Sequence, residues 1–304
     1  MADSFITAMK YSMTVGCAVA IVENLLVIAV FAGTKRLRLK YYAFIFNLAL
    51  ADLLFAIAGP TIPWIESIFS ECLTTAAYTV SVLTIFSAAI NRYLALSIMP
   101  PARYDSLVTG YRLIGVCILL WFFGLAYGLM LYLISISDPD VIVVIRTFGY
   151  SLVAFIIWVI TALAYFLAFR KIKQYTPPLA STAGISANME RDQTRVQQTR
   201  RLLILFVLIL MTSFFSWMPY GILSLITHFK PNLFYDITVL ALIWLGALLY
   251  TLSTVINPLL YWWRLDGFKE GFYAMFCRCV IKAEPRETEI VMSQNENTVA
   301  DTSL

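Results

Sequence analysis

Seven stretches of the chain are long and apolar enough to cross a lipid bilayer, and this constrains the fold more than any other feature. A bilayer core about 30 Å thick requires about 20 predominantly apolar residues in a helix. Five of the stretches contain no Asp, Glu, Lys or Arg, and the other two contain one acid each, Glu23 and Asp52. They are Tyr11–Gly33, Tyr41–Ile65, Cys72–Asn91, Leu113–Ser137, Phe148–Phe169, Leu202–Thr227 and Ile237–Trp263.

The composition excludes the alternative that these stretches are core helices of a soluble protein. The chain is 61% hydrophobic and 13% charged, whereas soluble domains contain about 45–50% apolar and about 25% charged residues. These values exclude an ordinary cytosolic enzyme, a disordered regulator and a nucleic-acid-binding domain. One histidine and five cysteines are too few for a dense metal or disulfide scaffold. We therefore predict an all-α membrane protein, a seven-transmembrane helix bundle.

The rest of the chain is divided among short segments. We expect an extracellular N-terminus at 1–10, the transmembrane domain at 11–263, a short amphipathic eighth helix at 264–279 and a disordered cytosolic tail at 280–304. The seven membrane helices are expected at about 11–33, 41–65, 66–97, 111–135, 148–170, 199–227 and 235–263.

Almost all basic residues lie on one side of this expected bundle. Of the 22 Lys and Arg residues, only Lys10, Arg146 and Lys230 fall on the other side. Cytoplasmic segments carry such an excess of Lys and Arg. The sequence therefore predicts a multi-pass plasma-membrane protein with its N-terminus outside and its C-terminus in the cytosol.

Several polar side chains fall inside the expected spans, where lipid offers no hydrogen-bond partner. Asp52 is the outstanding case, because an ionisable group at mid-membrane is expensive and suggests a function. The others are Asn24, Ser81, Ser253 and Asn257. Either one small polar cluster joins four helices, or each side chain separately bonds a backbone carbonyl.

Short motifs recur in a fixed order along the spans. They are Glu23-Asn24, Leu48-Ala-Leu-Ala-Asp52, Asn91-Arg92-Tyr93, Trp121, Tyr165, Ser216-Trp217-Met218-Pro219 and Asn257-Pro258-Leu259-Leu260-Tyr261. In this order the chain resembles the rhodopsin-like (class A) G-protein-coupled receptors over nearly all of its length. Within them it looks nearest to the melanocortin, lysophospholipid, cannabinoid and adenosine receptor branch. Ser67 replaces the usual cysteine above the third helix, and Ile157 replaces the usual proline of the fifth.

The resemblance implies a set of activation and G-protein-contact residues. They are Asn91, Arg92, Tyr93, Tyr165, Thr199, Trp217, Pro219, Pro258 and Tyr261. Arg92 is expected to meet the tail of a Gα subunit, and Tyr165 and Tyr261 to turn inward in the open form. In many of these receptors two acids hold the arginine inactive. The corresponding positions here carry Asn91 and Thr199, so we predict signalling without ligand.

The resemblance also implies an allosteric sodium ion. Its pocket would be formed by the intramembrane polar residues Asn24, Asp52, Ser81, Ser253 and Asn257, with Na⁺ at Asp52. Such a cation favours the inactive state only by binding it more tightly than the active state. No other cofactor is expected, and retinal is disfavoured because Thr251 occupies the position of the opsin lysine.

The expected ligand cavity is lined by Glu71, Thr74, Trp217, Tyr220, Ser224, His228 and Tyr250. Thr74 stands where amine receptors carry an aspartate, which argues against amine ligands. Gly221 and Ser224 stand where an adenosine site would have His and Asn. Glu71 could meet a basic group of a ligand or be a solvated rim carboxylate. An extracellular peptide or lipid is therefore favoured, with the choice between them open.

Two other classes of membrane protein would also contain several spans. A polytopic transporter would show inverted repeats or paired broken helices, and the sequence shows neither. An intramembrane enzyme would require paired carboxylates, and only Glu23 and Asp52 are available on neighbouring spans. The sequence favours a non-enzymatic receptor whose partners are membrane lipid and a heterotrimeric G protein, with no nucleic acid.

Two features near the C-terminus predict attachments. Phe268, Phe272 and Phe276 form an apolar stripe, and Cys277 and Cys279 follow it, so we expect palmitate on one or both cysteines. The chain ends in Asp301-Thr302-Ser303-Leu304, and Thr302 with the Leu304 carboxylate fits the peptide form bound by PDZ domains.

Overall fold

The computed structural model describes residues 2–34, 37, 42–65, 67–98, 101–175 and 187–277. The expected tail at 280–304, and with it the predictions for Cys279, Thr302 and Leu304, lies outside these residues.

Within the described ranges, seven helical segments are long and apolar enough to cross a membrane. They are Ser4–Gly33, Ala43–Ile65, Ile68–Ser97, Gly110–Ser137, Asp140–Lys173, Thr199–Phe229 and Ile237–Arg264. The predicted fold class, a seven-transmembrane helix bundle, is therefore confirmed.

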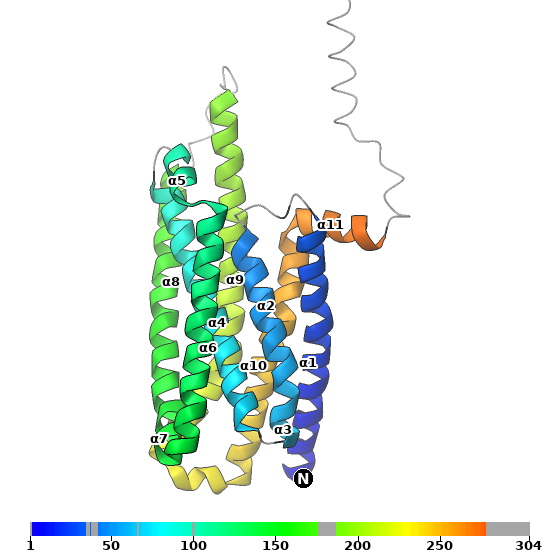
Figure 1. The fold of residues 1–304 in the computed structure, drawn as a ribbon, viewed down its shortest axis with the longest axis vertical. Helices are drawn as coiled ribbons and strands as arrows, with labels where there is room; N and C mark the ends of the chain where they lie inside the picture. The colour runs from blue at the N-terminus through cyan, green and yellow to red at the C-terminus, as the bar shows by residue number, and fades with distance from the viewer. Residues whose placement is uncertain are drawn as a thin grey trace, which may run out of the picture.

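The elements follow one another as helices joined by short turns (Figure 1). The first half contains α1 (Ala2–Gly33), α2 (Ala43–Ala58), a 3₁₀ turn η3 (Gly59–Thr61), α3 (Ile62–Ile65), α4 (Ile68–Ser97), α5 (Pro101–Leu107) and α6 (Gly110–Ser137). The second half contains α7 (Pro139–Val144), a π-helical turn η4 (Ile145–Gly149), α8 (Tyr150–Tyr175), α9 (Ala187–Phe229), η5 (Pro231–Tyr235), α10 (Ile237–Arg264) and α11 (Asp266–Phe276).

The long helices run roughly along one axis, with α4 in the middle of the bundle, where it packs against α2, α6, α8 and α9 (Figure 1). On the other side α1 packs against α2 and α10, and α9 packs against α10. One end of the bundle, at the top of Figure 1, carries α5 and α11 and is called the α11 end below. The opposite end carries the N-terminus, α3 and α7 and is called the N-terminal end.

Two segments that the sequence analysis left outside the membrane helices are helical. The expected N-terminal segment 1–10 is part of α1 from Ala2 onward. The last turn of this segment packs against the bundle, because the Lys10 ammonium lies 5.0 Å from the ring centre of Trp244 and the next residue, Tyr11, contacts Trp64.

The second segment lies between the expected membrane helices 111–135 and 148–170. Asp138 caps α7 by accepting a bond from the Val141 N–H at 3.2 Å, and Pro139 occupies the first helical turn. An Asp followed by Pro is a helix start signal, so the chain turns at Asp138 and at once begins a new helix.

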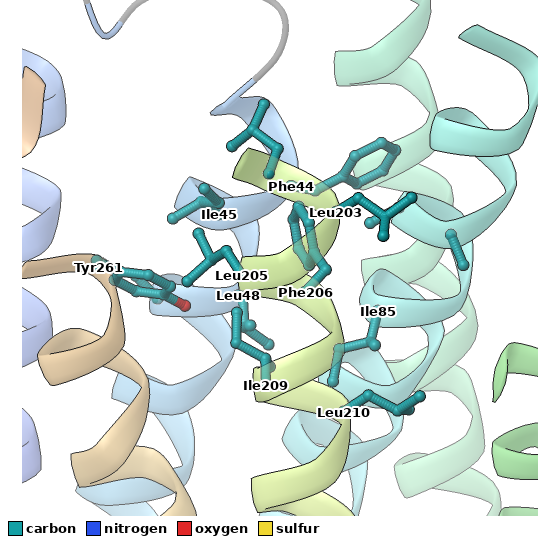
Figure 2. Packing of buried hydrophobic residues seen from close by; sticks show 14 of the residues in the cluster. Phe44, Ile45, Leu48, Ile85, Leu203, Leu205, Phe206, Ile209, Leu210 and Tyr261 are labelled. Carbon is teal, nitrogen blue, oxygen red and sulfur yellow. The ribbon is translucent and has the colours of Figure 1, made fainter. Parts of the chain in front are cut away.

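The core between the helices has an apolar layer towards the α11 end. Figure 2 shows it, with Phe44, Ile45 and Leu48 from α2 and Ile85 from α4 meeting a row of side chains from α9. That row is Leu203, Leu205, Phe206, Ile209 and Leu210. Nearly all these side chains are excluded from solvent. The layer therefore separates the middle of the bundle from its α11 end.

Two glycines let α6 approach α4 closely. A Cβ atom at Gly128 would lie 2.8 Å from the Ala76 Cβ and 2.9 Å from the Cys72 carbonyl oxygen, and one at Gly124 would lie 3.1 Å from the Ala76 carbonyl oxygen. Close backbone approach through small residues is the usual way in which membrane helices pack. A Cβ at Gly115 of the same helix would meet nothing within 4 Å.

Replacing Gly128 with valine should therefore destabilise the bundle, while the same change at Gly115 should not. Overpacking a tight contact costs about 1–3 kcal/mol, and the contact at Gly128 is with backbone that cannot move aside. Thermal unfolding of the two purified variants in detergent tests this. Equal unfolding temperatures for Gly128→Val and Gly115→Val would show that the close approach does not contribute to stability.

Candidate functional site

Asp52 lies in the middle of the bundle at the junction of three helices. Its Oδ2 accepts a hydrogen bond from the Asn257 side-chain nitrogen of α10 at 2.8 Å, and its Oδ1 accepts one from the Ser81 hydroxyl of α4 at 3.4 Å. The carboxyl group is buried, with 3% of the residue exposed. The structure therefore brings together three of the five residues predicted for the sodium pocket through direct hydrogen bonds.

A cavity opens beside this carboxyl group. Its volume is about 20 Å³ as sampled by the centre of a water-sized sphere, and one water needs roughly 10–15 Å³ on that measure. Its walls are Leu48, Asp52, Phe55, Tyr78, Ser81, Val82, Ile85, Ser213, Tyr250, Ser253, Thr254 and Asn257. The apolar layer of Figure 2 begins at two of these residues, Leu48 and Ile85, so it closes the cavity towards the α11 end.

The other two predicted pocket residues do not bond Asp52. Ser253 lines the cavity, but its hydroxyl donates to the Tyr250 carbonyl oxygen at 2.8 Å. The Asn24 side-chain nitrogen donates to the Ala20 carbonyl at 2.9 Å and to the Thr254 carbonyl at 3.2 Å. Pro258 has no N–H to bond the Thr254 carbonyl four residues earlier, so Asn24 takes the place of the missing helix bond.

The donor set of the cavity fits a small hard cation. Such ions prefer carboxylate, carbonyl and hydroxyl oxygens, and Asp52 and the Ser81 and Ser253 hydroxyls supply these. The side-chain oxygen of Asn257 is buried and has no hydrogen-bond partner among the described residues. An unsatisfied buried oxygen carries a desolvation cost, which a bound cation would offset.

Near the α11 end, the Asn91-Arg92-Tyr93 motif lies at the end of α4. Arg92 is buried, with 1% of the residue exposed. The Asn91 side-chain oxygen accepts a hydrogen bond from the Tyr104 hydroxyl of α5 at 2.7 Å, so α5 is held against the motif. Tyr93 packs at the edge of the apolar core.

The other predicted activation residues come from α8, α9 and α10. The Tyr165 hydroxyl of α8 donates to the Ile85 carbonyl at 3.1 Å. Tyr261 of α10 is fully buried and points towards the apolar layer in Figure 2. Thr199 is also buried, with 6% exposed. Pro219 and Pro258 lie within α9 and α10, as the sequence predicted.

Tyrosines fill the centre of the bundle between the cavity and the N-terminal end. Tyr78 stacks on Trp217, with ring centres 6.3 Å apart, and meets Tyr250 edge to face at 5.0 Å. Tyr150 of α8 adds a further edge contact to Tyr78 at 5.9 Å. Trp217 and Tyr250, two predicted ligand-cavity residues, are thus in contact through Tyr78.

The remaining predicted ligand residues lie nearer the N-terminal end. Glu71 forms an ion pair with Arg146 of the π turn, with 2.5 Å between Oε2 and Nη1. His228 exchanges a 2.9 Å hydrogen bond with Thr147, and Thr74 and Ser224 are buried. Tyr220 lies at the α9–α10 contact, against Gly246. Glu71 is thus paired with Arg146 while its side chain stays 28% exposed, and its role in ligand binding stays a prediction.

Several residues in this arrangement were not singled out from sequence. Asn47 donates to the Thr84 hydroxyl at 2.7 Å and accepts from the Trp121 indole N–H at 2.9 Å, which joins α2, α4 and α6. Tyr104 and Tyr78 were also missed. Asn47 is a polar residue within a span, and that signal could have identified it. Neither Tyr78, in an apolar helix, nor Tyr104, in the short polar helix α5, gives such a signal.

A bundle of seven membrane-length helices with a buried polar junction at its centre is the architecture of a multi-pass membrane protein. The chain matches the family described as 7 transmembrane receptor (rhodopsin family) over residues 23–261. It belongs to that family, and the predicted resemblance is confirmed. Receptors of this family are not enzymes, as expected.

Curated relatives cover most of the chain. It is 25% identical to Adenosine receptor A3 of Canis lupus familiaris over 280 residues, which span 84% of this chain and 87% of that protein. Adenosine receptor A3 of Ovis aries is 26% identical, with 86% and 87% covered. Adenosine receptor A2b of Canis lupus familiaris is 25% identical, with 94% and 93% covered. These proteins lie in the branch that the sequence analysis favoured.

Proposed function

We propose that this protein is a plasma-membrane receptor that converts binding of an extracellular ligand into activation of a heterotrimeric G protein. The observation that carries the proposal is Arg92, which is buried at the α11 end of the central helix. The tyrosine of α5 bonds its neighbour Asn91. A buried arginine at a helix end, next to a short helix, is suited to recognise a peptide terminus once the bundle opens.

The charge distribution supports the proposed orientation. Arg103, Arg112, Lys173, Arg200 and Lys269 belong to helices or helix ends at the α11 end, whereas Lys10, Arg146 and Lys230 belong to the N-terminal end. Because cytoplasmic segments carry the excess of basic residues, the α11 end faces the cytosol in this proposal and ligands enter from the N-terminal end.

The proposed ligand is a peptide or a lipid rather than an amine, retinal or a nucleoside. Thr74 and Thr251 are neutral, and Glu71, the acid among the predicted ligand-cavity residues, is paired with Arg146. Although the relatives are named adenosine receptors, Gly221 stands where an adenosine site would have His. A Cβ atom there would lie 2.8–3.0 Å from the Trp217 ring, so a histidine would require the indole to move.

The proposal includes a bound ion, a lipid modification and a protein partner. Na⁺ is proposed at Asp52, bound by the oxygens of Ser81, Ser253 and Asn257, while Asn24 holds α10 through its bond to the Thr254 carbonyl. Palmitate is proposed on Cys277, the residue directly after α11, which carries no disulfide, and on Cys279. The terminal Thr302 and Leu304 are proposed to bind a PDZ domain.

The decisive experiment measures coupling before any ligand is known. Expressed with a panel of chimeric Gα reporters, the receptor should raise the signal of at least one Gα class without ligand. Arg92→Ala should remove this signal, because it removes the proposed contact with Gα. Adenosine, added next, should leave the signal unchanged. Ion currents in liposomes combined with silence across the whole panel would instead support the transporter alternative.

A further inference from the structure

An ion pair joins α9 to α11 at the α11 end of the bundle. Nη1 of Arg201 lies 3.0 Å from Oδ2 of Asp266 and donates a hydrogen bond to it. Arg201 is near the point where α9 enters the bundle, and Asp266 is the first residue of α11. Sixty-five positions separate the two residues in sequence, so the pair is a tertiary contact between two helices.

Several interactions hold Asp266, the acidic partner, in place. Asp266 occupies the first turn of α11, where the positive end of the helix dipole stabilises a carboxylate. Lys269, one turn further on, lies 3.8 Å from its other oxygen. Phe268 of α11 is buried against the ring of Phe31 in α1 and that of Trp262 in α10. Asp266 is therefore attached to a helix that is itself anchored on α1 and α10.

The basic partner, Arg201, belongs to α9, the helix that carries Thr199. Neither Asn91 nor Thr199, the two positions at which the family holds the helix-three arginine with acids, carries a charge. For the bundle to open at this end, as the proposed function requires, the part of α9 between this end and Pro219 must swing outward. Because α11 is anchored on α1 and α10, such a swing would separate Arg201 from Asp266.

We propose that the Arg201–Asp266 pair restrains α9 in the inactive arrangement, and so limits signalling without ligand; the inference rests on the proposed function. The pair replaces, at a different place on α9, the restraint that a carboxylate at position 199 would provide. It ties α9 to α11 rather than to α4.

The size of the effect follows from the exposure of the pair. The two side chains are 68% and 61% exposed, so water screens their attraction. Loss of an exposed ion pair changes an equilibrium constant by about 1.5- to 5-fold. Arg201→Gln should therefore raise ligand-independent GTP exchange on the coupled Gα by that factor, at equal surface expression.

Two neighbouring residues provide matched controls. Arg200→Gln removes the same charge from the adjacent, exposed position of α9, and should leave basal exchange unchanged. Lys269→Gln removes the second contact of Asp266, which lies within α11 and does not reach α9, and should also have little effect.

Charge reversal separates the pair from the individual residues. Arg201→Asp and Asp266→Arg should each raise basal exchange, and the double variant should return towards the original level because the pair is rebuilt with opposite signs. A double variant more active than either single one would overturn the inference. So would equal basal exchange in Arg201→Gln and Arg200→Gln.

A distance measurement tests the tie without a G protein. Spin labels are placed on Arg200→Cys in α9 and on Ala274→Cys, an exposed position of α11, in a purified receptor that also carries Cys277→Ser and Cys279→Ser. The label–label distance should lengthen or broaden when Arg201→Gln is added and recover in the charge-reversed double variant. An unchanged distance contradicts the inference. If the label–label distance lengthens but no variant stimulates GTP exchange, the restraint of α9 by the Arg201–Asp266 pair stands and the proposed G-protein coupling is refuted.

Discussion

Replacing Asp52 with asparagine should remove the dependence of basal signalling on sodium. In the unmodified receptor, sodium at about ten times its dissociation constant for the inactive state should lower the active fraction about tenfold. The reason is that Asp52 is the carboxylate of a cavity whose other polar walls are neutral oxygens. GTP exchange in membranes measures the effect, with sodium replaced by choline at constant ionic strength.

The control for this substitution is Asp138→Asn. Asp138 is an exposed helix cap at the N-terminal end, so its substitution makes the same change in net charge away from the cavity. Its sodium response should equal that of the unmodified receptor. Sodium dependence that persists in Asp52→Asn would show that the ion acts elsewhere, and the fit of the oxygen set would then be incidental.

Restoring either missing acid near Arg92 should lower signalling without ligand. Asn91→Asp places a carboxylate beside Arg92 and keeps an oxygen to accept the Tyr104 hydroxyl, which now lies 2.7 Å from the amide oxygen. Thr199→Glu places a carboxylate on α9 at a buried position. A stabilisation of the inactive state by about 1.4 kcal/mol lowers a small active population roughly tenfold. A partly buried ion pair can reach this value, because it can exceed the about 0–1 kcal/mol that an exposed ion pair contributes.

These two substitutions are best compared in the Gα reporter assay at matched surface expression. Thr199→Val, which fills the same buried position without a charge, is the control for Thr199→Glu. If neither acid changes basal signalling, contacts other than those to Arg92 hold the inactive state. The Arg201–Asp266 pair is then the first contact to examine.

The sequence was sufficient for the parts of the fold that depend on burial in lipid. Apolar runs predicted seven spans because a bilayer imposes a minimum helix length, and Asp52, Ser81 and Asn257 were recognised because polar groups in lipid need partners. What it could not supply were contacts between residues far apart in the chain. The pairing of Glu71 with Arg146 depends on how η4 faces α4, and the Tyr104–Asn91 bond depends on where α5 docks.

Helix ends were harder to predict than helix centres. α9 extends from Ala187, well before the predicted start at 199, since its first turns are polar and give no hydrophobic signal. Conversely, the helical turns from Pro139 to Thr147 precede the expected start of the fifth span at 148, because Asp140 and Arg146 interrupt the apolar run. Outside the membrane, helix formation depends on capping and local propensity rather than on burial, and those signals are weaker.

The π turn at Ile145–Gly149 has a consequence for the faces of the fifth membrane helix. A π turn accommodates one residue more than an α-helical turn, and each residue of an α-helix rotates the side chain by about 100°. Side chains before and after the π turn therefore point in directions that one uninterrupted α-helix would not give them. Arg146 and Thr147, within the π turn, contact Glu71 of α4 and His228 of α9. Tyr150, the first residue of α8, contacts Tyr78 and Trp217. The faces of this helix before and after the π turn are therefore set separately, so its contacts near the N-terminal end can change without altering the register of α8 in the middle of the bundle.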